Sequence, residues 1–277
     1  LRNDTLFHDA RFTGMDLPAS VERTRSAARE ALDLFGLAGG SRAAVDQSPY
    51  LSAREKTEVV EGGYELLLIL AEAMAQPLRG EDGAAQARQA LALLDRAGGL
   101  HAPTQAYHLR RASCLARMRD RRGVEQENKL ASALEPASAL DYFLLGSERY
   151  KANDYGKAIE HLDAALRLEP KHFWAQYLVA LCYLGAGQPA EAKASLTACL
   201  HRREDFVWLY LLRGFSYGEM GQLARSRQRQ TQASLWFEAA AADFRKARKL
   251  LEQEPNREAE YALLANRGVL NYRQRRW

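Results

Sequence analysis

The side chains best able to carry out chemistry in this chain are its 3 cysteines and 6 histidines. A cysteine thiolate can act as a nucleophile or, like a histidine imidazole, bind a metal ion. Cys114, Cys182 and Cys199 form no CxxC pair, and no two histidines have the spacing that brings metal ligands together on a helix. We therefore expect His161 and His172 to pack at the surface and the cysteines to be buried, inert thiols. No metal site, cofactor or catalytic residue is predicted.

The sequence also lacks the short motifs that mark common catalytic and nucleotide-binding sites. It contains no HExxH, GxSxG or GxGxxG pattern and no GxxxxGK[ST] phosphate-binding loop. The glycine-rich segment from Gly36 to Ser41 has no lysine and no obvious preceding strand, so a flexible link is its expected role. These observations favour a surface that binds a partner over an enzyme.

Charge is nearly balanced, with 39 basic and 35 acidic side chains and a net charge of +4. Such a balance excludes a strongly basic, histone-like nucleic-acid binder. Three local arginine clusters are Arg117, Arg119, Arg121 and Arg122; Arg225, Arg227 and Arg229; and Arg273, Arg275 and Arg276. We interpret them as solvated helix ends, and the alternative is an anionic partner such as RNA or a phosphorylated segment. No aromatic residues alternate with these arginines, so nucleic acid is not the expected partner.

The setting of the chain follows from its cysteines and its apolar stretches. An odd number of cysteines without a disulfide pattern favours a reducing, cytoplasmic environment. The longest apolar stretch, from Tyr64 to Ala75, contains Glu65 and Glu72 and is shorter than the about 20 residues that a bilayer requires. We therefore expect no membrane partner. The chain opens on Leu1 without a signal-peptide pattern, which suggests a fragment of a larger multidomain protein.

Small and apolar residues recur along the chain at intervals of 34 positions. The series are Ala131, Ala165 and Cys199; Gly146, Ala180 and Gly214; Ala158 and Ala192; Leu162 and Leu196; and Pro136 and Pro170. All of them share one phase, which is hard to obtain by chance. A period of this length indicates stacked helix–turn–helix repeats, because each repeat buries its apolar face only against its neighbours.

The segment 139–172 carries this pattern most fully. In order it contains Tyr142, Leu145, Gly146, Ala158, Leu162, Ala165 and Pro170. This order resembles the tetratricopeptide repeat (TPR) family, whose repeats are pairs of antiparallel helices. The small Gly146 and Ala158 allow two helices to approach closely, and Ala165 lets the next repeat dock. Pro170 ends the second helix, because its ring excludes the helical conformation from the preceding residue.

We therefore predict an all-α fold, a right-handed α-solenoid of TPR repeats with an N-terminal helical lead-in. The predicted parts are a lead-in and linker over 1–50, a degenerate repeat with a long first helix over 51–104, two TPR repeats over 105–206 together with 139–172 as the clearest one, an extended repeat over 207–255, and the lone first helix of a truncated repeat over 256–277. Ser52 and Glu55 form a capping box that opens the long first helix.

The extended repeat contains an insertion. Gly214 and Ala240 lie 26 positions apart, whereas the equivalent Gly146 and Ala158 lie 12 apart, so 14 residues are inserted. The inserted residues centre on the arginine-rich stretch 225–229. Because alanine, glutamine and arginine tolerate helix, we predict two lengthened helices here and not a loose loop.

By analogy with the TPR family, five positions of each first helix face a concave groove that binds peptides. These predicted groove residues include Phe143, Ser147, Tyr150, Lys151, Trp174, Tyr177, Leu181, Trp208, Leu211 and Phe215. The lining is aromatic and apolar, which suits a peptide with apolar anchors. The alternative for Trp174 and Trp208 is packing between adjacent repeats. Lys151 stands nearly alone, so a clamp of basic side chains for a partner's carboxylates is not predicted.

Several stretches resemble a narrower group of proteins. Leu6 to His8, Phe12 to Pro18, Asp141 to Gly146 and His172 to Tyr177 resemble the TPR-bearing C-terminal regions of large bacterial serine/threonine protein kinases of the planctomycete type. The resemblance implies the non-catalytic part of such a protein, since the chain has no kinase glycine-rich loop, no catalytic His-Arg-Asp and no Asp-Phe-Gly.

The predicted function is protein–protein recognition by a non-catalytic TPR scaffold that binds a protein or peptide partner. One alternative is a regulatory or substrate-recruiting region of a serine/threonine protein kinase, and a further one is an RNA-binding helical repeat. The last helix has no partner helix in the sequence. Self-association through an apolar face around Ala262, Leu263 and Val269 is therefore also open.

Overall fold

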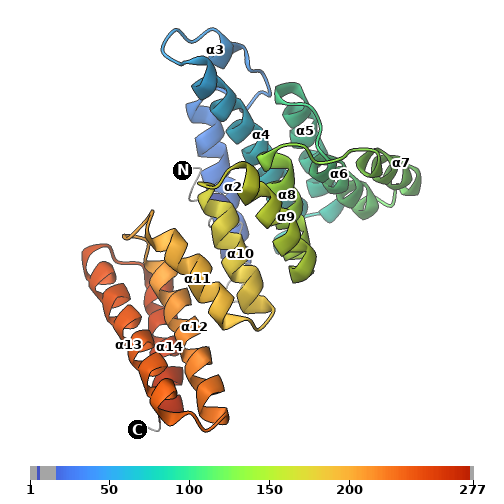
Figure 1. Cartoon of the computed structure of the whole chain (residues 1–277). Helices are drawn as coiled ribbons and strands as arrows, with labels where there is room; N and C mark the ends of the chain where they lie inside the picture. Colours follow the sequence, from blue (N-terminus) through green and yellow to red (C-terminus); the bar gives the residue numbers. More distant parts are fainter. Residues whose placement is uncertain (1–4, 7–16, 275–277) are drawn as a thin grey trace. The chain divides into compact units, whose positions relative to one another are not determined.

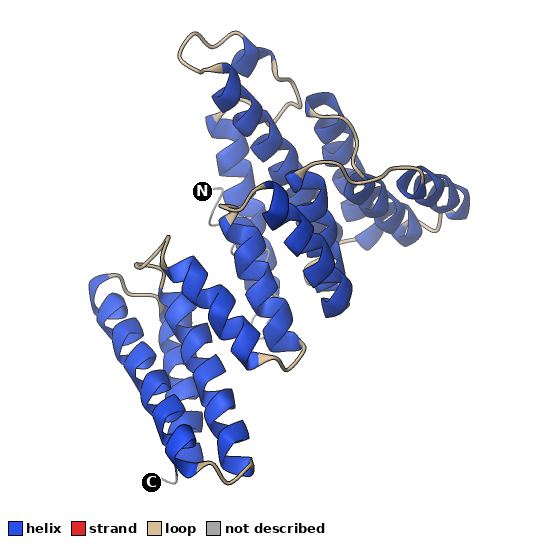
Figure 2. Cartoon of the chain, in the orientation of Figure 1, coloured by secondary structure: helices blue, strands red, loops and turns tan. Residues whose placement is uncertain are grey.

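The computed structural model describes residues 5–6 and 17–274, and every regular element in these ranges is a helix (Figure 1; Figure 2). The helices are α2 (Leu17–Leu34), α3 (Ala43–Asp46), α4 (Ala53–Ala75), α5 (Gly83–Leu100), α6 (Gln105–Arg117), α7 (Arg121–Ser132), α8 (Ala139–Lys151), α9 (Tyr155–Leu168), α10 (Phe173–Gly185), α11 (Pro189–Leu200), α12 (Val207–Ser226), α13 (Gln230–Gln253) and α14 (Arg257–Gln274). The prediction of an all-α fold is confirmed. Within the described residues, no helix combines the length and apolar character needed to cross a lipid bilayer. Residues 7–8 and 12–16 of the kinase-like stretches, and Arg275 and Arg276 of the last arginine cluster, lie outside the described residues.

The described chain forms two compact units, an N-terminal unit up to Lys151 and a C-terminal unit from Ala152. The boundary falls inside the segment 139–172, which we predicted as a single repeat. Its first helix, α8, packs against α6 in the N-terminal unit, and its second helix, α9, packs against α10 in the C-terminal unit. The antiparallel pairs α4/α5, α6/α7, α10/α11 and α12/α13 each lie within one unit.

Helix α4 forms the centre of the N-terminal unit. It packs against α2 and α5, and its Tyr64 and Leu67 belong to one buried core cluster with Leu94 of α5. The predicted capping box is present. The Ser52 N–H donates to Glu55 Oε2 at 2.8 Å, and the Glu55 N–H donates to Ser52 Oγ at 3.3 Å. These two bonds satisfy backbone donors that the first turn of a helix leaves without partners.

The glycine-rich link after α2 is anchored, which differs from the flexible segment we expected. Leu37 within it is only 1% exposed and packs against Gly63 of α4. A Cβ atom on Gly63 would lie 2.4 Å from Cδ1 of Leu37. Gly40 has φ +76°, and a Cβ there would lie 2.7 Å from the carbonyl oxygen of Arg96 in α5. Glycine is required at Gly40, where a side chain would clash with the backbone of α5 and φ is positive, whereas at Gly63 the end of the Leu37 side chain would have to shift.

The insertion in the C-terminal unit extends both helices of its repeat, as predicted. Helix α12 has 20 residues and α13 has 24, whereas α10 has 13 and α11 has 12. Ala158, Ala165, Ala180 and Ala192, the small residues of the repeat pattern, are all 0% exposed in α9, α10 and α11. The exposed Pro170 follows the end of α9. The small side chains therefore lie where helices approach closely.

A glycine–phenylalanine contact holds the two long helices together and occurs twice. A Cβ on Gly214 would lie 2.4 Å from Cε1 of Phe244, and a Cβ on Gly221 would lie 2.5 Å from Cε1 of Phe237. Along each helix the two contacts are seven residues apart, which is about two turns of an α-helix. The added turns therefore reproduce the contact that the unextended part of the repeat already makes.

We predict that Gly221→Leu lowers the free energy of unfolding by about 1–3 kcal/mol, because overpacking outweighs the better helix propensity of leucine. Gly268→Leu in α14 is the matched control, since a Cβ there meets nothing within 4 Å. The control substitution is expected to raise the free energy of unfolding by up to about 1 kcal/mol. Urea denaturation measures both. Equal stability of the two variants would contradict the close contact at Gly221.

Candidate functional site

The three cysteines have no reactive thiolate. Cys114, Cys182 and Cys199 are buried and free. Burial raises the pKa of Cys114 to about 11 and the pKa values of Cys182 and Cys199 to about 12. Thiols with such pKa values stay protonated near neutral pH and are poor nucleophiles. The predicted burial of the three cysteines is confirmed. Within residues 5–6 and 17–274, no three His, Cys, Asp or Glu side chains are grouped to hold a metal ion.

Four charged side chains from three first helices form a charge network in the N-terminal unit: Glu72 of α4, Arg110 of α6, and Glu148 and Lys151 of α8. Arg110 Nη2 lies 2.6 Å from Glu148 Oε1 and 3.2 Å from Glu72 Oε2, and Lys151 Nζ lies 2.6 Å from Glu72 Oε2. The two cationic side chains are 4% and 7% exposed. Lys151 is therefore paired within the chain, as a buried ammonium group requires an anion.

The charge network keeps Glu72 ionised. Burial by itself would raise the pKa of this carboxyl, but Lys151 and Arg110 outweigh it and hold the pKa of Glu72 below its usual range. The positive charges of Arg110 and Lys151 are thus balanced inside the chain. These two cations do not form a clamp that is free for a partner's carboxylates.

We predict an acid-dependent loss of stability from this network. Because the folded pKa of Glu72 lies below its unfolded value of about 4.5, its stabilisation is complete above pH 4.5 and is lost as the pH falls through the folded pKa. The measurement is the difference in unfolding free energy between the wild type and Glu72→Gln from pH 7 to pH 3. The difference should shrink below pH 4.5, and a difference that stays constant would contradict the prediction.

Most of the predicted groove residues are buried. Phe143, Ser147 and Tyr150 of α8 are 3%, 6% and 8% exposed, and Leu181 and Leu211 in the C-terminal unit are 9% and 2% exposed. Such residues offer little surface to a partner. Their positions on the first helices agree with the repeat pattern, but their side chains face other parts of the chain.

Trp174 and Tyr177 lie in an aromatic cluster with Phe173 and Phe206. The ring centroid of Trp174 lies 5.6 Å from that of Tyr177 and 6.4 Å from that of Phe206. Trp174 is 5% exposed and Tyr177 is 2% exposed. The guanidinium carbon of Arg203 lies 4.7 Å from the centroid of Phe206 and covers the cluster from outside. Phe206 immediately precedes α12. Trp174 of α10 therefore packs against the start of the following repeat, which agrees with the alternative of packing between adjacent repeats.

Trp208 and Phe215 are the two aromatic residues of the predicted groove that stay partly accessible. Both are half-buried and lie seven residues apart on α12, on one face of the helix. Glu219 continues the same face, and its Oε1 pairs with Arg273 Nη2 of α14 at 2.5 Å. This face therefore presents two aromatic side chains beside a fixed ion pair.

Sequence reasoning missed a polar brace that joins three helices of the C-terminal unit. Arg213 of α12 donates to both carboxylate oxygens of Asp243 in α13, at 2.8 and 2.7 Å, and to Thr197 Oγ1 of α11 at 3.2 Å. Its guanidinium carbon also lies 5.9 Å from the ring centroids of both Tyr210 and Tyr217. One signal was present in the repeat pattern. Arg213 occupies a position that is apolar in the two preceding repeats.

The exposed face of α14 differs from the predicted one. Leu263 is only 5% exposed because α14 packs against both α12 and α13. The exposed apolar residues are Tyr261, Leu264 and Tyr272, at 61%, 67% and 67%, with Val269 at 44%. An apolar stripe is present on α14, but it is rotated away from Leu263.

The described arginines of the three clusters lie at helix ends, as interpreted. Arg117 ends α6 and donates a hydrogen bond to the carbonyl of Ala75 at the end of α4. Arg225 makes the same type of contact with the carbonyl of Arg273 near the end of α14. Arginine at such positions satisfies carbonyls that have no partner within their own helix.

Comparisons with known proteins show what parts of this chain are similar to. Residues 149–229 match the family model described as tetratricopeptide repeat. YrrB, a TPR protein with an unusual peptide-binding site, is 14% identical, with 76% of this chain and 97% of that chain covered and a TM-score of 0.40. The TPR2AB domain of yeast Sti1 in complex with a pHSP90 is 13% identical, with 89% and 99% covered and a TM-score of 0.40. The APC/C Cut9–Hcn1 hetero-tetramer is 15% identical, with 95% and 54% covered and a TM-score of 0.45.

No curated protein matches the sequence significantly. The family model covers α9 to α12 together with the end of α8, which are the helices that carry the repeat pattern most clearly. Together with the antiparallel helix pairs, this match supports the tetratricopeptide repeat family for the segment 149–229.

Proposed function

We propose that this chain is a non-catalytic scaffold that binds a protein or peptide partner through its first helices. The observation that supports the proposal most directly is the face of α12. Trp208 and Phe215 lie partly exposed on a rigid helix that α11, α13 and α14 hold from other sides. Aromatic anchors on a pre-ordered surface bind a peptide with little loss of receptor entropy.

A peptide display library tests this function. Peptides selected on the wild-type protein are expected to contain large apolar side chains. Their affinity for the Trp208→Ala/Phe215→Ala variant should fall about tenfold or more, as for hot-spot residues. Leu235→Ala is the control, because Leu235 is an apolar residue of α13 that is 60% exposed. Equal losses in the two variants would rule out α12 as the binding face.

The finer parts of the proposal concern the setting of this scaffold. We predict from the sequence resemblance that the protein is bacterial and cytoplasmic. In this prediction the scaffold recruits substrates for a serine/threonine protein kinase. The reading frame that encodes this chain tests it, since a kinase domain in the same polypeptide is the expected finding. A frame without such a domain would remove the kinase alternative and leave the peptide-binding proposal intact.

A further inference from the structure

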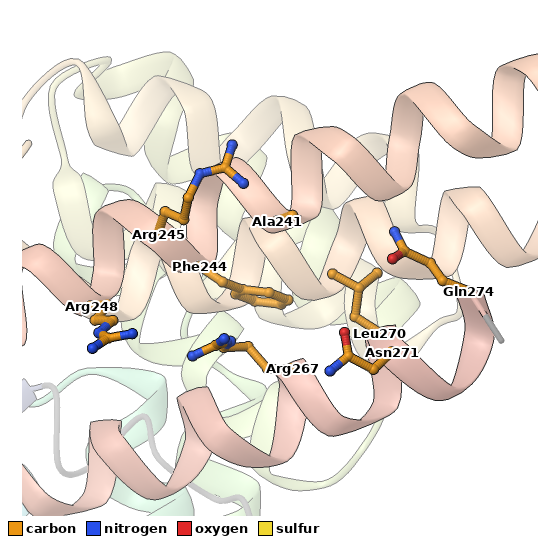
Figure 3. A pocket seen from close by; sticks show the side chains of 8 residues that line it. All are labelled: Ala241, Phe244, Arg245, Arg248, Arg267, Leu270, Asn271 and Gln274. Carbon is orange, nitrogen blue, oxygen red and sulfur yellow. The ribbon is translucent and has the colours of Figure 1, made fainter. Parts of the chain in front are cut away.

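A small pocket lies between α13 and α14 in the C-terminal unit, away from the predicted groove residues (Figure 3). Its volume is about 220 Å³, and its lining residues are Ala241, Phe244, Arg245, Arg248, Arg267, Leu270, Asn271 and Gln274. Figure 3 shows the Phe244 ring in the middle, with Arg267, Leu270 and Asn271 on α14 and Arg245 and Arg248 on α13; the Arg245 side chain points away from the ring. Phe244 and Leu270 are 3% and 5% exposed and form an apolar floor.

The lining carries positive charge that the described residues do not balance. It contains three arginines and no carboxylate. Arg248 shares an ion pair with Glu252 at 3.3 Å, but both side chains are 63% exposed, so the pair is weak. Within residues 17–274, no ion pair joins Arg245 or Arg267 to an acidic side chain.

Other arginines of the C-terminal unit are paired with acidic side chains of the same unit. Arg213 binds both oxygens of Asp243, and Arg273 pairs with Glu219. The contrast marks the pocket as one whose lining holds three arginines and no internal anion. Like charges around one concave surface repel each other, and a bound anion relieves this repulsion.

We propose that this pocket binds the phosphoryl group of a phosphorylated side chain in a partner polypeptide. A phosphomonoester carries about −1.5 to −2 charges near pH 7, which matches two uncompensated arginines better than a single carboxylate does. Guanidinium groups also offer paired donors that fit phosphate oxygens. The amides of Asn271 and Gln274 supply further hydrogen-bonding groups at the same opening.

The size of the pocket indicates a peptide side chain as the carrier of this group. Small-molecule sites usually measure about 300–1,000 Å³, so a volume of about 220 Å³ suits one modified side chain better than a whole cofactor. Phe244 and Leu270 are almost fully buried, so the polar groups at the opening provide the contacts with the bound side chain. The pocket is independent of the α12 face, because Trp208 and Phe215 do not line it.

Titration calorimetry with three probes tests the proposal. The probes are a short capped peptide with one phosphoserine between two leucines, the same peptide without phosphate, and inorganic phosphate. The phosphopeptide should bind and the unmodified peptide should not. Inorganic phosphate should bind at least about tenfold more weakly than the phosphopeptide. Absence of phosphopeptide binding overturns the proposal, and equally tight binding of inorganic phosphate overturns the assignment to a polypeptide.

Charge-matched variants locate the binding. Arg245→Gln and Arg267→Gln should each weaken phosphopeptide binding about tenfold or more, since each removes a charge-assisted hydrogen bond. Lys246→Gln on α13 and Arg257→Gln on α14 remove the same charge from exposed positions that do not line the pocket. These controls should change the affinity less than about twofold. Equal effects in both sets would overturn the site, and circular dichroism verifies that all four variants fold.

Discussion

Trp174→Ala is expected to lower the free energy of unfolding by about 3–5 kcal/mol, the range for removal of a large buried aromatic side chain. The substitution opens a cavity in the aromatic cluster and removes ring contacts at 5.1 Å with Phe173 and at 5.6 Å with Tyr177. The C-terminal unit should therefore unfold at a much lower urea concentration. Urea denaturation followed by far-ultraviolet circular dichroism measures the effect.

Tyr261→Ala is the control for this prediction, because Tyr261 is an aromatic residue of α14 that is 61% exposed. Its free energy of unfolding should stay within about 0.5 kcal/mol of the wild type. A Trp174→Ala variant as stable as this control would show that the indole ring is not part of the core. Trp174 would then return to the list of residues that can contact a partner.

Asp243→Ala is expected to lower the free energy of unfolding by about 3–5 kcal/mol, because it leaves Arg213 inside the protein without its anion. The two side chains are only 18% and 8% exposed, so water cannot replace the carboxylate well. The double variant Arg213→Met/Asp243→Leu should recover a large part of the loss, since two apolar side chains need no partner. Thermal and urea unfolding of the single and double variants measure the coupling.

Glu252→Ala provides the comparison within the same helix. It removes the carboxylate of the Arg248–Glu252 pair, in which both side chains are 63% exposed. Exposed ion pairs contribute about 0–1 kcal/mol, so this variant should differ little from the wild type. If Asp243→Ala and Glu252→Ala had equally small effects, the brace around Arg213 would not stabilise the helix packing.

The architecture could be predicted from the sequence because its determinants are local and periodic. Small residues such as Ala158, Ala192 and Gly214 recur at one spacing, and only close helix contacts require them. The extension of α12 and α13 followed from the distance between Gly214 and Ala240 and from residue types that favour helix.

The predicted groove was less successful because a repeat pattern places a residue on a helix face without showing what covers that face. Phe206, which covers Trp174, belongs to the connection before the next helix and has no fixed place in the pattern. Arg213 and Asp243 are 30 positions apart, so their pairing depends on how α12 and α13 pack. The arginine pocket likewise depends on the contact between α13 and α14, and no motif in either helix encodes it.

Because the glycine–phenylalanine contact is repeated, the length of the α12/α13 hairpin can change without a change in the way its two helices pack. Seven residues added to each helix bring the next contact into the same rotational position, so the hairpin elongates in discrete increments. An increment that is not close to a whole number of helical turns would turn Phe237 away from Gly221. Variation in the length of such a hairpin should therefore occur as matched steps of nearly whole turns in its two helices.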